Sequence, residues 1–477
     1  MVFSSIEFLW FFMPVVLLAY AAVPPRLRNA LLAAVSLVFY VWGAHAILFV
    51  FLASIAINFI AGRLIGRFQA QDREEAARRT MWVAIVANLA ILFTWKYTLF
   101  AVEQLNAALG LAGDTKIPEP SITLPIGISF FTFHGISYVV DVARGQARPM
   151  RRPADFAQYM AFFPQLIAGP IIRYREIDDQ IRNPPPRSQR LGDIAEGFPR
   201  FALGLCKKVL IADQVAPIAN AAFSDPGNLT MSAAWIGALA YTVQIYFDFS
   251  GYSDMAIGLA RMFGFRFPEN FDRPYSAVSM TDFWRRWHIT LSRWFRDYVY
   301  IPLGGSRVSQ AVTVRNLLIV FLLVGAWHGA EWTFILWGLY HGAFLITERV
   351  TGIRKLPDER LAIPRRAATF LAVVLGWVLF RAADLGDAAD VYSAMASFDF
   401  GPLPAALDEV LTAQPVLALG VGLASALLPR GFVFGRVLEG GWSGAPLGAR
   451  VAVVAAAPLA AIYVAAGSFS PFLYFQF

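Results

Sequence analysis

Long apolar stretches alternate with short polar loops along this chain. Runs of about 17–25 apolar residues, the length that crosses the hydrocarbon core of a bilayer, recur throughout. We expect about eleven or twelve crossings, in an all-α polytopic membrane protein. Their predicted ranges are 6–22, 30–42, 46–62, 81–99, 122–140, 198–222, 232–256, 312–326, 331–349, 367–382, 411–428 and 451–467.

Two segments do not read as simple crossings. Residues 156–175 are apolar but interrupted by Pro164, Gly169 and Pro170, with basic residues on both flanks. Free backbone groups at membrane depth are tolerated only where protein buries them, so we predict a re-entrant element here.

Residues 279–298 have the period of one amphipathic helix. Ser279 and Asp282 predict a capping box at its start. One face carries Trp284, Trp287, His288, Leu291, Trp294, Phe295 and Tyr298, and the opposite face carries Arg285, Arg286, Arg293 and Arg296.

Composition excludes an ordinary soluble domain. Of 477 residues, 57% are hydrophobic and only 15% are charged. The single cysteine, Cys206, rules out an internal disulfide or a cysteine cluster for zinc. The first apolar run lacks a basic leader and a small-residue cleavage site, so we expect a retained helix. No internal repeat is evident, which predicts one membrane-embedded domain over 1–477 with a catalytic core near 120–350.

The distribution of charge predicts the orientation. The net charge of +7 comes from arginines in short loops, which is typical of membrane topology rather than of nucleic-acid binding. Basic loops carry Arg26, Arg28, Arg63, Arg67, Arg73, Arg78, Arg79, Arg144, Arg148, Arg151, Arg152, Arg349, Arg354, Lys355, Arg360, Arg365 and Arg366. Alternate loops carry Glu103, Asp114, Glu119, Asp384, Asp387, Asp390 and Asp399. The positive-inside rule then places the N-terminus outside the cytoplasm.

His328 is the strongest candidate for chemistry. It follows Trp327 at the end of an apolar run, and an ionisable group at membrane depth is a functional candidate by default. Gly325 and Gly329 are expected to leave room for a substrate beside it. The alternative is a core histidine bonded to a backbone carbonyl.

The other histidines carry weaker signals. His288 lies on the aromatic face of its predicted helix, where function and packing are equally good interpretations. His341 would lie opposite His328 on a continuous helix, which favours a structural or supporting role. His45 and His134 are expected to be structural.

Several kinds of site are not indicated. The chain has no HExxH, paired cysteines, GxSxG elbow, P-loop or dinucleotide fingerprint, so we predict no metal site and no nucleophile triad. A lone histidine suits general-base work on a hydroxyl that the substrate supplies. Asp248 and Asp254 could orient a histidine or bind an arginine, or could join helices through hydrogen bonds.

The combined motifs resemble the membrane-bound O-acyltransferases, and among them the alginate O-acetylation type. The matching segments begin at Met1 (MVFSS), Leu124 (LPIGISFFTFHGISYVVDVARG), Phe162 (FFPQLIAGPIIRYRE), Gln244 (QIYFDFSGYSDMAIGLARMFGF), Glu269 (ENFDRPYSAVSMTDFWRRWHITLSRWFRDYVYIPLGG), Gly325 (GAWHGAEWTFILWGLYHG) and Pro471 (PFLYFQF). His134 departs from the pattern, in which an amide or carboxylate is expected.

The resemblance implies a fold around a central tunnel, in the bacterial inner membrane. It implies acetyl-CoA as cytoplasmic donor, His328 as the essential histidine and His288 as a second tunnel histidine. Asp248, Asp254, Trp327 and His341 would support them. The acceptor would be a periplasmic acetyltransferase partner, AlgJ-, AlgF- or AlgX-like, acting on an exported polysaccharide. No bound cofactor and no nucleic acid is implied.

Coenzyme A phosphates need cations at the cytoplasmic mouth of such a tunnel. The candidates are Arg173, Arg175, Lys207, Lys208, Arg285 and Arg286, although plain positive-inside charge explains each one alone.

Other functions stay open at this point. Alginate is the expected polymer, with cellulose and peptidoglycan as alternatives. A transporter of an acetylated carrier should have paired pseudo-repeats with interrupted helices, and none is evident. A scaffold for periplasmic enzymes would leave His288 and His328 unexplained.

Overall fold

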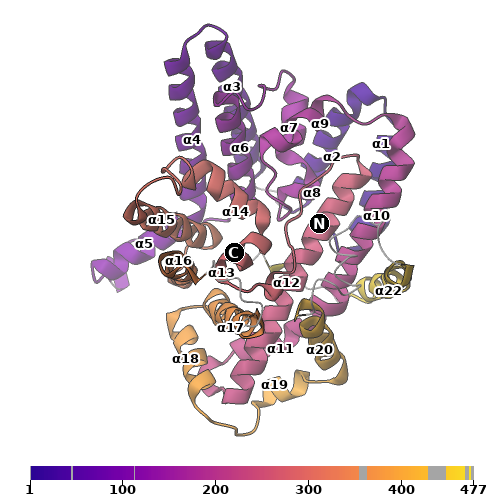
Figure 1. The fold of residues 1–477 in the computed structure, drawn as a ribbon. Helices are drawn as coiled ribbons and strands as arrows, with labels where there is room; N and C mark the ends of the chain where they lie inside the picture. Colours follow the sequence, from indigo (N-terminus) through magenta and orange to yellow (C-terminus); the bar gives the residue numbers. More distant parts are fainter. Residues whose placement is uncertain are drawn as a thin grey trace. The chain divides into compact units, whose positions relative to one another are not determined.

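The computed structural model describes residues 2–43, 47–111, 113–353, 362–427, 447–467 and 472–473. Every regular element in these ranges is helical, which confirms the predicted all-α class (Figure 1). His45, Arg354, Lys355, Arg360 and most of the C-terminal PFLYFQF motif lie outside the described residues.

The chain divides into two compact units. Unit 1 comprises Met1, Glu7–Ile194 and Leu259–Pro268, and unit 2 comprises Val2–Ile6, Ala195–Gly258 and Glu269–Phe477. Helices α10 and α12 each continue across the division. A single domain over the whole chain therefore stays a prediction.

Unit 1 is built from apolar helices and one interrupted segment. Its main helices are η1 (Glu7–Phe12), α1 (Met13–Ala22), α2 (Arg28–Gly43), α3 (Leu48–Gln69), α4 (Glu74–Lys96), α5 (Thr98–Ala108), α6 (Ile128–Ala143), α7 (Pro153–Ala161), α8 (Phe163–Leu166) and α9 (Tyr174–Arg182). Helix α6 packs against both α3 and α4 (Figure 1).

A buried polar pair joins α3 to α4. Asn58 Nδ2 donates to Asn88 Oδ1 at 2.9 Å, and Asn88 Nδ2 donates back to Asn58 Oδ1 at 2.8 Å. Amide pairs of this kind hold apolar helices together where the hydrophobic effect cannot, because lipid is as apolar as the helix surface.

The predicted break in residues 156–175 is confirmed. Helix α7 ends at Ala161, α8 at Leu166, and an extended stretch leads into α9. The freed backbone groups are satisfied inside the protein: the Tyr159 hydroxyl donates to Ile172 O at 3.1 Å. Gly169 is required because a Cβ there would lie 2.5 Å from Pro164 O.

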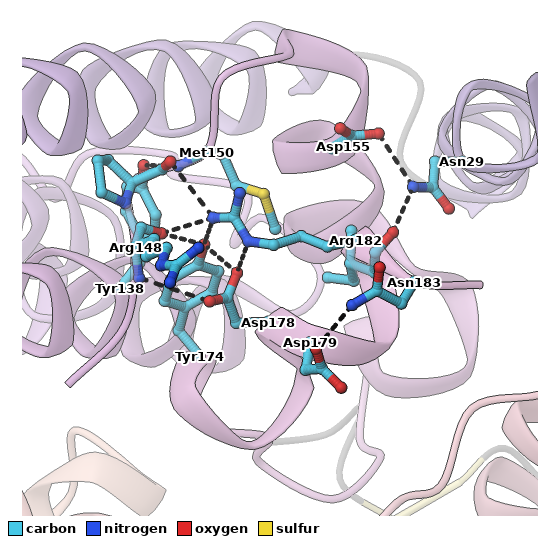
Figure 2. Close-up of polar contacts among 12 residues, drawn as sticks. Asn29, Tyr138, Arg148, Met150, Asp155, Tyr174, Asp178, Asp179, Arg182 and Asn183 are labelled. Carbon is cyan, nitrogen blue, oxygen red and sulfur yellow. Dashed lines mark hydrogen bonds and ion pairs between the residues drawn. The ribbon is translucent and has the colours of Figure 1, made fainter. Parts of the chain in front are cut away.

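Helix α9 is tied to the basic loop after α6 (Figure 2). The Tyr174 hydroxyl donates to Arg148 O at 2.6 Å and to Asp178 Oδ1 at 2.8 Å. Arg182 Nε binds the same carboxylate at 2.5 Å. These bonds hold the loop that carries part of the predicted cytoplasmic charge.

Unit 2 contains the predicted chemistry. Its helices are α10 (Arg190–Lys207) in part, η5 (Lys208–Ala212), α11 (Asp213–Phe223), α12 (Met231–Met262) in part, α13 (Met280–Arg286), α14 (Ile289–Phe295), η8 (Arg296–Tyr300), α15 (Gln310–His328), α16 (Trp332–Thr351), α17 (Ala362–Arg381), α18 (Leu385–Ala396), α19 (Ala405–Val410), α20 (Ala413–Leu427) and α22 (Leu447–Ala465). Helix α16 packs against α13, α15 and α17.

The chain is a polytopic membrane protein. Among described residues, α3, α4, α15 and α17 are long and apolar enough to cross a bilayer. Shorter apolar helical stretches cover Glu7–Ala22, Ile128–Ala143, Ala413–Leu427 and Val451–Ala465. The number of crossings and the side of the N-terminus stay predictions.

The predicted single helix over 279–298 is wrong. Helix α13 ends at Arg286, and His288 takes a left-handed conformation with φ +42° before α14 begins. The cause lies elsewhere in the chain: Asn270 O accepts from Ile289 N at 2.9 Å. Asn270 Oδ1 also accepts from Thr290 N, so neither amide bonds along the helix.

The two predicted faces of this segment survive the break. Trp284, Trp287, His288, Leu291, Trp294 and Phe295 are buried, whereas Arg285, Arg293 and Arg296 are exposed. Ser279 caps α13 as expected, its hydroxyl accepting from Asp282 N at 3.1 Å.

Candidate active site

Three buried histidines lie in unit 2. His328 is the last residue of α15, His341 belongs to α16, and His288 joins α13 to α14. His288 and His341 are fully buried and His328 is 3% exposed. Burying an imidazole is costly unless its nitrogens are used, so the partners of each ring matter.

The hydrogen bonds of His288 assign its tautomer. Asn270 Oδ1 lies 3.1 Å from His288 Nδ1 and also accepts from the Thr290 hydroxyl at 2.8 Å. Asn270 Nδ2 donates to Ser253 Oγ at 3.1 Å, which identifies Oδ1 as the acceptor. His288 Nδ1 must then carry the proton, leaving a lone pair on Nε2.

Burial keeps this imidazole neutral. It lowers the pKa of His288 to about 3. The ring of Phe249 packs edge-on at 4.8 Å, adding apolar surroundings. A neutral ring with a lone pair on Nε2 is the form that accepts a proton.

Trp327 contacts both His288 and His328. Its ring centroid is 6.0 Å from that of His288 and 4.9 Å from that of His328. The rings of Trp337 and Phe380 contact His328 at 5.0 and 5.1 Å. The structure thus brings His288 and His328 into contact with the same indole.

The continuous helix that would place His341 opposite His328 does not form. The chain turns between α15 and α16, so the two histidines belong to different helices. Trp337 contacts both, with centroid distances of 5.0 Å to His328 and 4.8 Å to His341. The indole Nε1 of Trp284 donates to His341 Nδ1 at 3.4 Å.

The room expected around Gly325 and Gly329 is filled by α16. A Cβ on Gly325 would lie 2.4 Å from Phe334 O, and one on Gly329 would lie 2.0 Å from the Phe334 ring. A Cβ on Gly338 would likewise lie 2.3 Å from Phe321 O. These glycines allow α15 and α16 to pack closely, which corrects their predicted role.

Asp248 and Asp254 form ion pairs with lysines. Among the residues that the structure describes, they do not orient a histidine. Lys208 Nζ lies 2.7 Å from Asp248 Oδ1, and also binds Asp213 at 2.6 Å. Lys207 Nζ lies 2.6 Å from Asp254 Oδ2. All of these side chains are at least nine-tenths buried, so this is the helix-joining role.

Arg200 extends the second of these ion-pair groups. It binds Asp254 at 2.5 Å and Glu269 at 2.7 Å. The charges of Lys207 and Lys208 are therefore matched by buried carboxylates, which removes the reason for assigning the two lysines to phosphate.

A basic hollow opens beside α13. It encloses about 560 Å³ and is lined by Val278, Ser279, Thr281, Asp282, Arg285, Arg286 and Arg365. Arg286 Nε is held by Asp282 at 2.9 Å. Arg285 is exposed and makes no ion pair within the described residues. Three guanidinium groups around one hollow can bind phosphate oxygens bidentately.

The remaining predicted residues lie in unit 1. Arg173 is buried and binds Glu176 at 2.5 Å, and Arg175 binds Gln146 at 2.5 Å. His134 is buried in α6 with its ring 5.6 Å from that of Tyr159.

Comparison with known proteins gives the family. Residues 127–356 match the MBOAT, membrane-bound O-acyltransferase family. "Probable alginate O-acetylase AlgI" of Azotobacter vinelandii is 44% identical over the full length of both chains. The protein of that name from Pseudomonas aeruginosa is 47% identical, covering 83% of this chain and 75% of its own. "Peptidoglycan O-acetyltransferase" of Helicobacter pylori is 36% identical, covering 83% and 80%.

The chain belongs to the membrane-bound O-acyltransferase family. It is an O-acyltransferase. Transfer of an acyl group to a hydroxyl is assisted by a base that takes the hydroxyl proton. The two histidines that contact Trp327 are the candidates for this base within unit 2, and the basic hollow is the candidate site for an acyl donor.

Pattern alone missed several residues of this O-acyltransferase site. Asn270, Trp337, Phe380 and Arg365 stand in motifs or loops that are visible in the sequence, but no local period marks them. Each contributes through a contact with a residue far away along the chain.

Proposed function

We propose that this O-acyltransferase takes acetyl from cytoplasmic acetyl-CoA and passes it across the bacterial inner membrane to a periplasmic partner. The acetyl group is then placed on an exported polysaccharide, alginate. The observation that carries the proposal is the pair of buried histidines, His288 and His328, whose rings both contact Trp327. The names of the relatives in Azotobacter and Pseudomonas, both alginate O-acetylases, support alginate as the polymer.

The donor is assigned to the basic hollow. Coenzyme A carries three phosphate groups, and Arg285, Arg286 and Arg365 line one open depression. Arginine binds phosphate in a fixed, two-pronged geometry that lysine lacks. Arg173 and Arg175 stay as further candidates in unit 1.

Helix α17 supports separate ends for donor and acceptor. Arg365 in its first turn lines the hollow, while Phe380 near its last turn contacts the ring of His328. Fifteen residues of α-helix span about 22 Å, most of a hydrocarbon core. The positive-inside rule assigns the Arg365 end to the cytoplasm, so His328 faces the periplasmic side.

The histidines supply the proton chemistry. His328 removes the proton from an acceptor hydroxyl as its oxygen attacks the thioester, and returns that proton to the leaving thiolate. His288, with its lone pair on Nε2, assists by accepting a hydrogen bond from a substrate group other than this hydroxyl, whose single proton goes to His328. General-base groups of this kind contribute about 10²–10⁴-fold to rate.

A sealed-vesicle assay tests this function. The purified chain is reconstituted, labelled acetyl-CoA is supplied on the side of the basic loops, and partner with alginate is supplied on the other. Label should cross to the partner or polymer with the wild-type chain and not with His328→Ala. His134→Gln, a buried histidine in unit 1, is the matched control and should transfer normally.

Three results would count against the proposal. Absence of any transfer by the wild-type chain refutes the function, and normal transfer by His328→Ala refutes the base. Full acetylation of polymer with no partner protein present refutes the relay. Cellulose and peptidoglycan, supplied in parallel with their own partners, identify the polymer if alginate stays unlabelled.

A further inference from the structure

Two N–H groups lie on the same face of α16. Trp337 and His341 are four residues apart, which places neighbouring side chains one turn apart on a helix. Their ring centroids are 4.8 Å apart, and both side chains are fully buried.

Both groups are hydrogen-bond donors. An indole Nε1 can only donate. His341 Nδ1 accepts the Trp284 indole N–H at 3.4 Å, so it holds the lone pair and the proton of the neutral ring is on Nε2.

Neither donor has an acceptor within the part of the chain that the structure describes. Trp337 Nε1 and His341 Nε2 are both buried and unpaired there. A buried donor without an acceptor is destabilising, so an acceptor supplied from outside the protein would stabilise these two N–H groups. Trp377, an equally buried tryptophan nearby, shows the usual arrangement: its Nε1 donates to the Tyr275 hydroxyl at 3.1 Å.

Ring contacts connect the Trp337 and His341 side chains to His328 on one side and to α13, which borders the basic hollow, on the other. The ring of Trp337 is 5.0 Å from that of His328. On the other side, the ring of His341 is 5.4 Å from that of Trp284, and the next residue along α13, Arg285, lines the hollow. An acyl donor whose phosphates bind in the hollow and whose thioester reaches His328 would extend from one end of this series of ring contacts to the other.

We infer that His341 Nε2–H and Trp337 Nε1–H donate hydrogen bonds to the thioester carbonyl oxygen of the acyl donor during transfer. This rests on the proposed function, and it adds two catalytic residues to that site. Trp284 is a positioning residue, because it fixes the proton of His341 on Nε2.

The step balances without any further reagent. His328 takes the proton of the acceptor hydroxyl as its oxygen bonds to the carbonyl carbon, and the C=O π pair moves onto the oxygen. That oxyanion is held by the two N–H groups. When it collapses, the C–S bond breaks, and the thiolate takes the proton from His328. Fixed donors of this type act because charge develops where they already point.

The test compares kcat and KM for acetyl-CoA in matched variants. His341→Phe and Trp337→Phe keep a ring of similar shape and remove the N–H. Each should lower kcat by about 10²–10³-fold while KM changes little, since the bond forms mainly in the transition state. His341→Gln restores an N–H near the Nε2 position and should recover much of the loss. Trp377→Phe removes a buried N–H that already has a protein acceptor, and kcat should stay near wild type.

The outcomes separate the inference from the proposed function. If the wild-type chain transfers acetyl and His328→Ala does not, the function stands whatever these variants do. If His341→Phe and Trp337→Phe then keep wild-type kcat, the two donors bind only water and the inference is overturned. Gel filtration and thermal unfolding in detergent identify a variant that has lost its fold. An equal loss of kcat in His341→Gln and His341→Phe, with both folded, also overturns the role of Nε2–H.

Discussion

Asn270 holds His288 by a side-chain hydrogen bond of 3.1 Å between Oδ1 and Nδ1, across eighteen residues of chain. The same residue takes the backbone N–H of Ile289 through its carbonyl oxygen. One asparagine therefore sets both the backbone break at His288 and the tautomer of its ring. The left-handed backbone of His288 is a strained state of the kind that persists where surrounding structure over-determines it.

Asn270→Ala should reduce activity through His288. Loss of Oδ1 leaves Nδ1–H without its acceptor and lets the ring turn, so kcat should fall by about 10²-fold, the low end for general acid–base groups. The free energy of unfolding should fall by about 1–3 kcal/mol because buried donors lose their partner. Steady-state kinetics and thermal unfolding measure the two effects. Asn228→Ala, an exposed asparagine in unit 2, is the control; equal kinetics in both variants would contradict the assignment.

The charge state of His288 predicts the pH dependence of stability. Its pKa is lowered from about 6.5 to about 3 by burial, so the folded protein binds fewer protons than the unfolded chain between these values. Its contribution to stability is present above pH 6.5 and is lost progressively as pH falls toward 3. Thermal unfolding in detergent should show a steeper acid loss for wild type than for His288→Gln. Parallel curves for the two proteins would show that His288 is not buried in the neutral form.

Removing the cations of the hollow should weaken donor binding. Arg285→Ala combined with Arg286→Ala should raise KM for acetyl-CoA by about 10-fold or more, since a hydrogen bond to a charged group contributes about 1.5–3 kcal/mol. Arg293→Ala is the control, because Arg293 is exposed in α14 and does not line the hollow. A change in expression alone, with KM unaltered in the folded double variant, would exclude a phosphate site.

Lys208→Ala should act on stability and not on donor affinity. The substitution leaves Asp213 and Asp248 buried beside each other without their shared cation. Breaking such a pair costs about 3–5 kcal/mol. Thermal unfolding should therefore shift strongly, while KM for acetyl-CoA in the folded fraction stays near wild type. Lys116→Ala, which removes an exposed pair with Glu119, should change stability by less than about 1 kcal/mol. A raised KM in Lys208→Ala would restore this lysine to the donor site.

The local sequence pattern was sufficient to predict the all-α fold class and where several helices begin or end. The predicted crossing at 312–326 corresponds to α15, which begins two residues earlier and ends two residues later, at His328. Pro164, Gly169 and Pro170 predicted an interruption because proline breaks a helix interior and glycine destabilises it, and the chain breaks in this segment. The alternation of aromatic and arginine positions in 279–298 predicted which side chains are buried, because burial follows the side-chain period even where the backbone is interrupted.

Only the tertiary structure decided which residues form hydrogen bonds, ion pairs and ring contacts with the candidate site residues. The break at His288 depends on Asn270, and the carboxylates that neutralise Lys207 and Lys208 come from α11 and α12. Trp337 contacts both His328 and His341, and this arrangement depends on the turn that separates α15 from α16. Helical period reports which way a side chain points relative to its own axis, whereas these contacts depend on where a second helix lies. The position of the second helix depends on close packing between residues far apart in the chain, as where Gly325 and Gly338 let α15 and α16 approach each other.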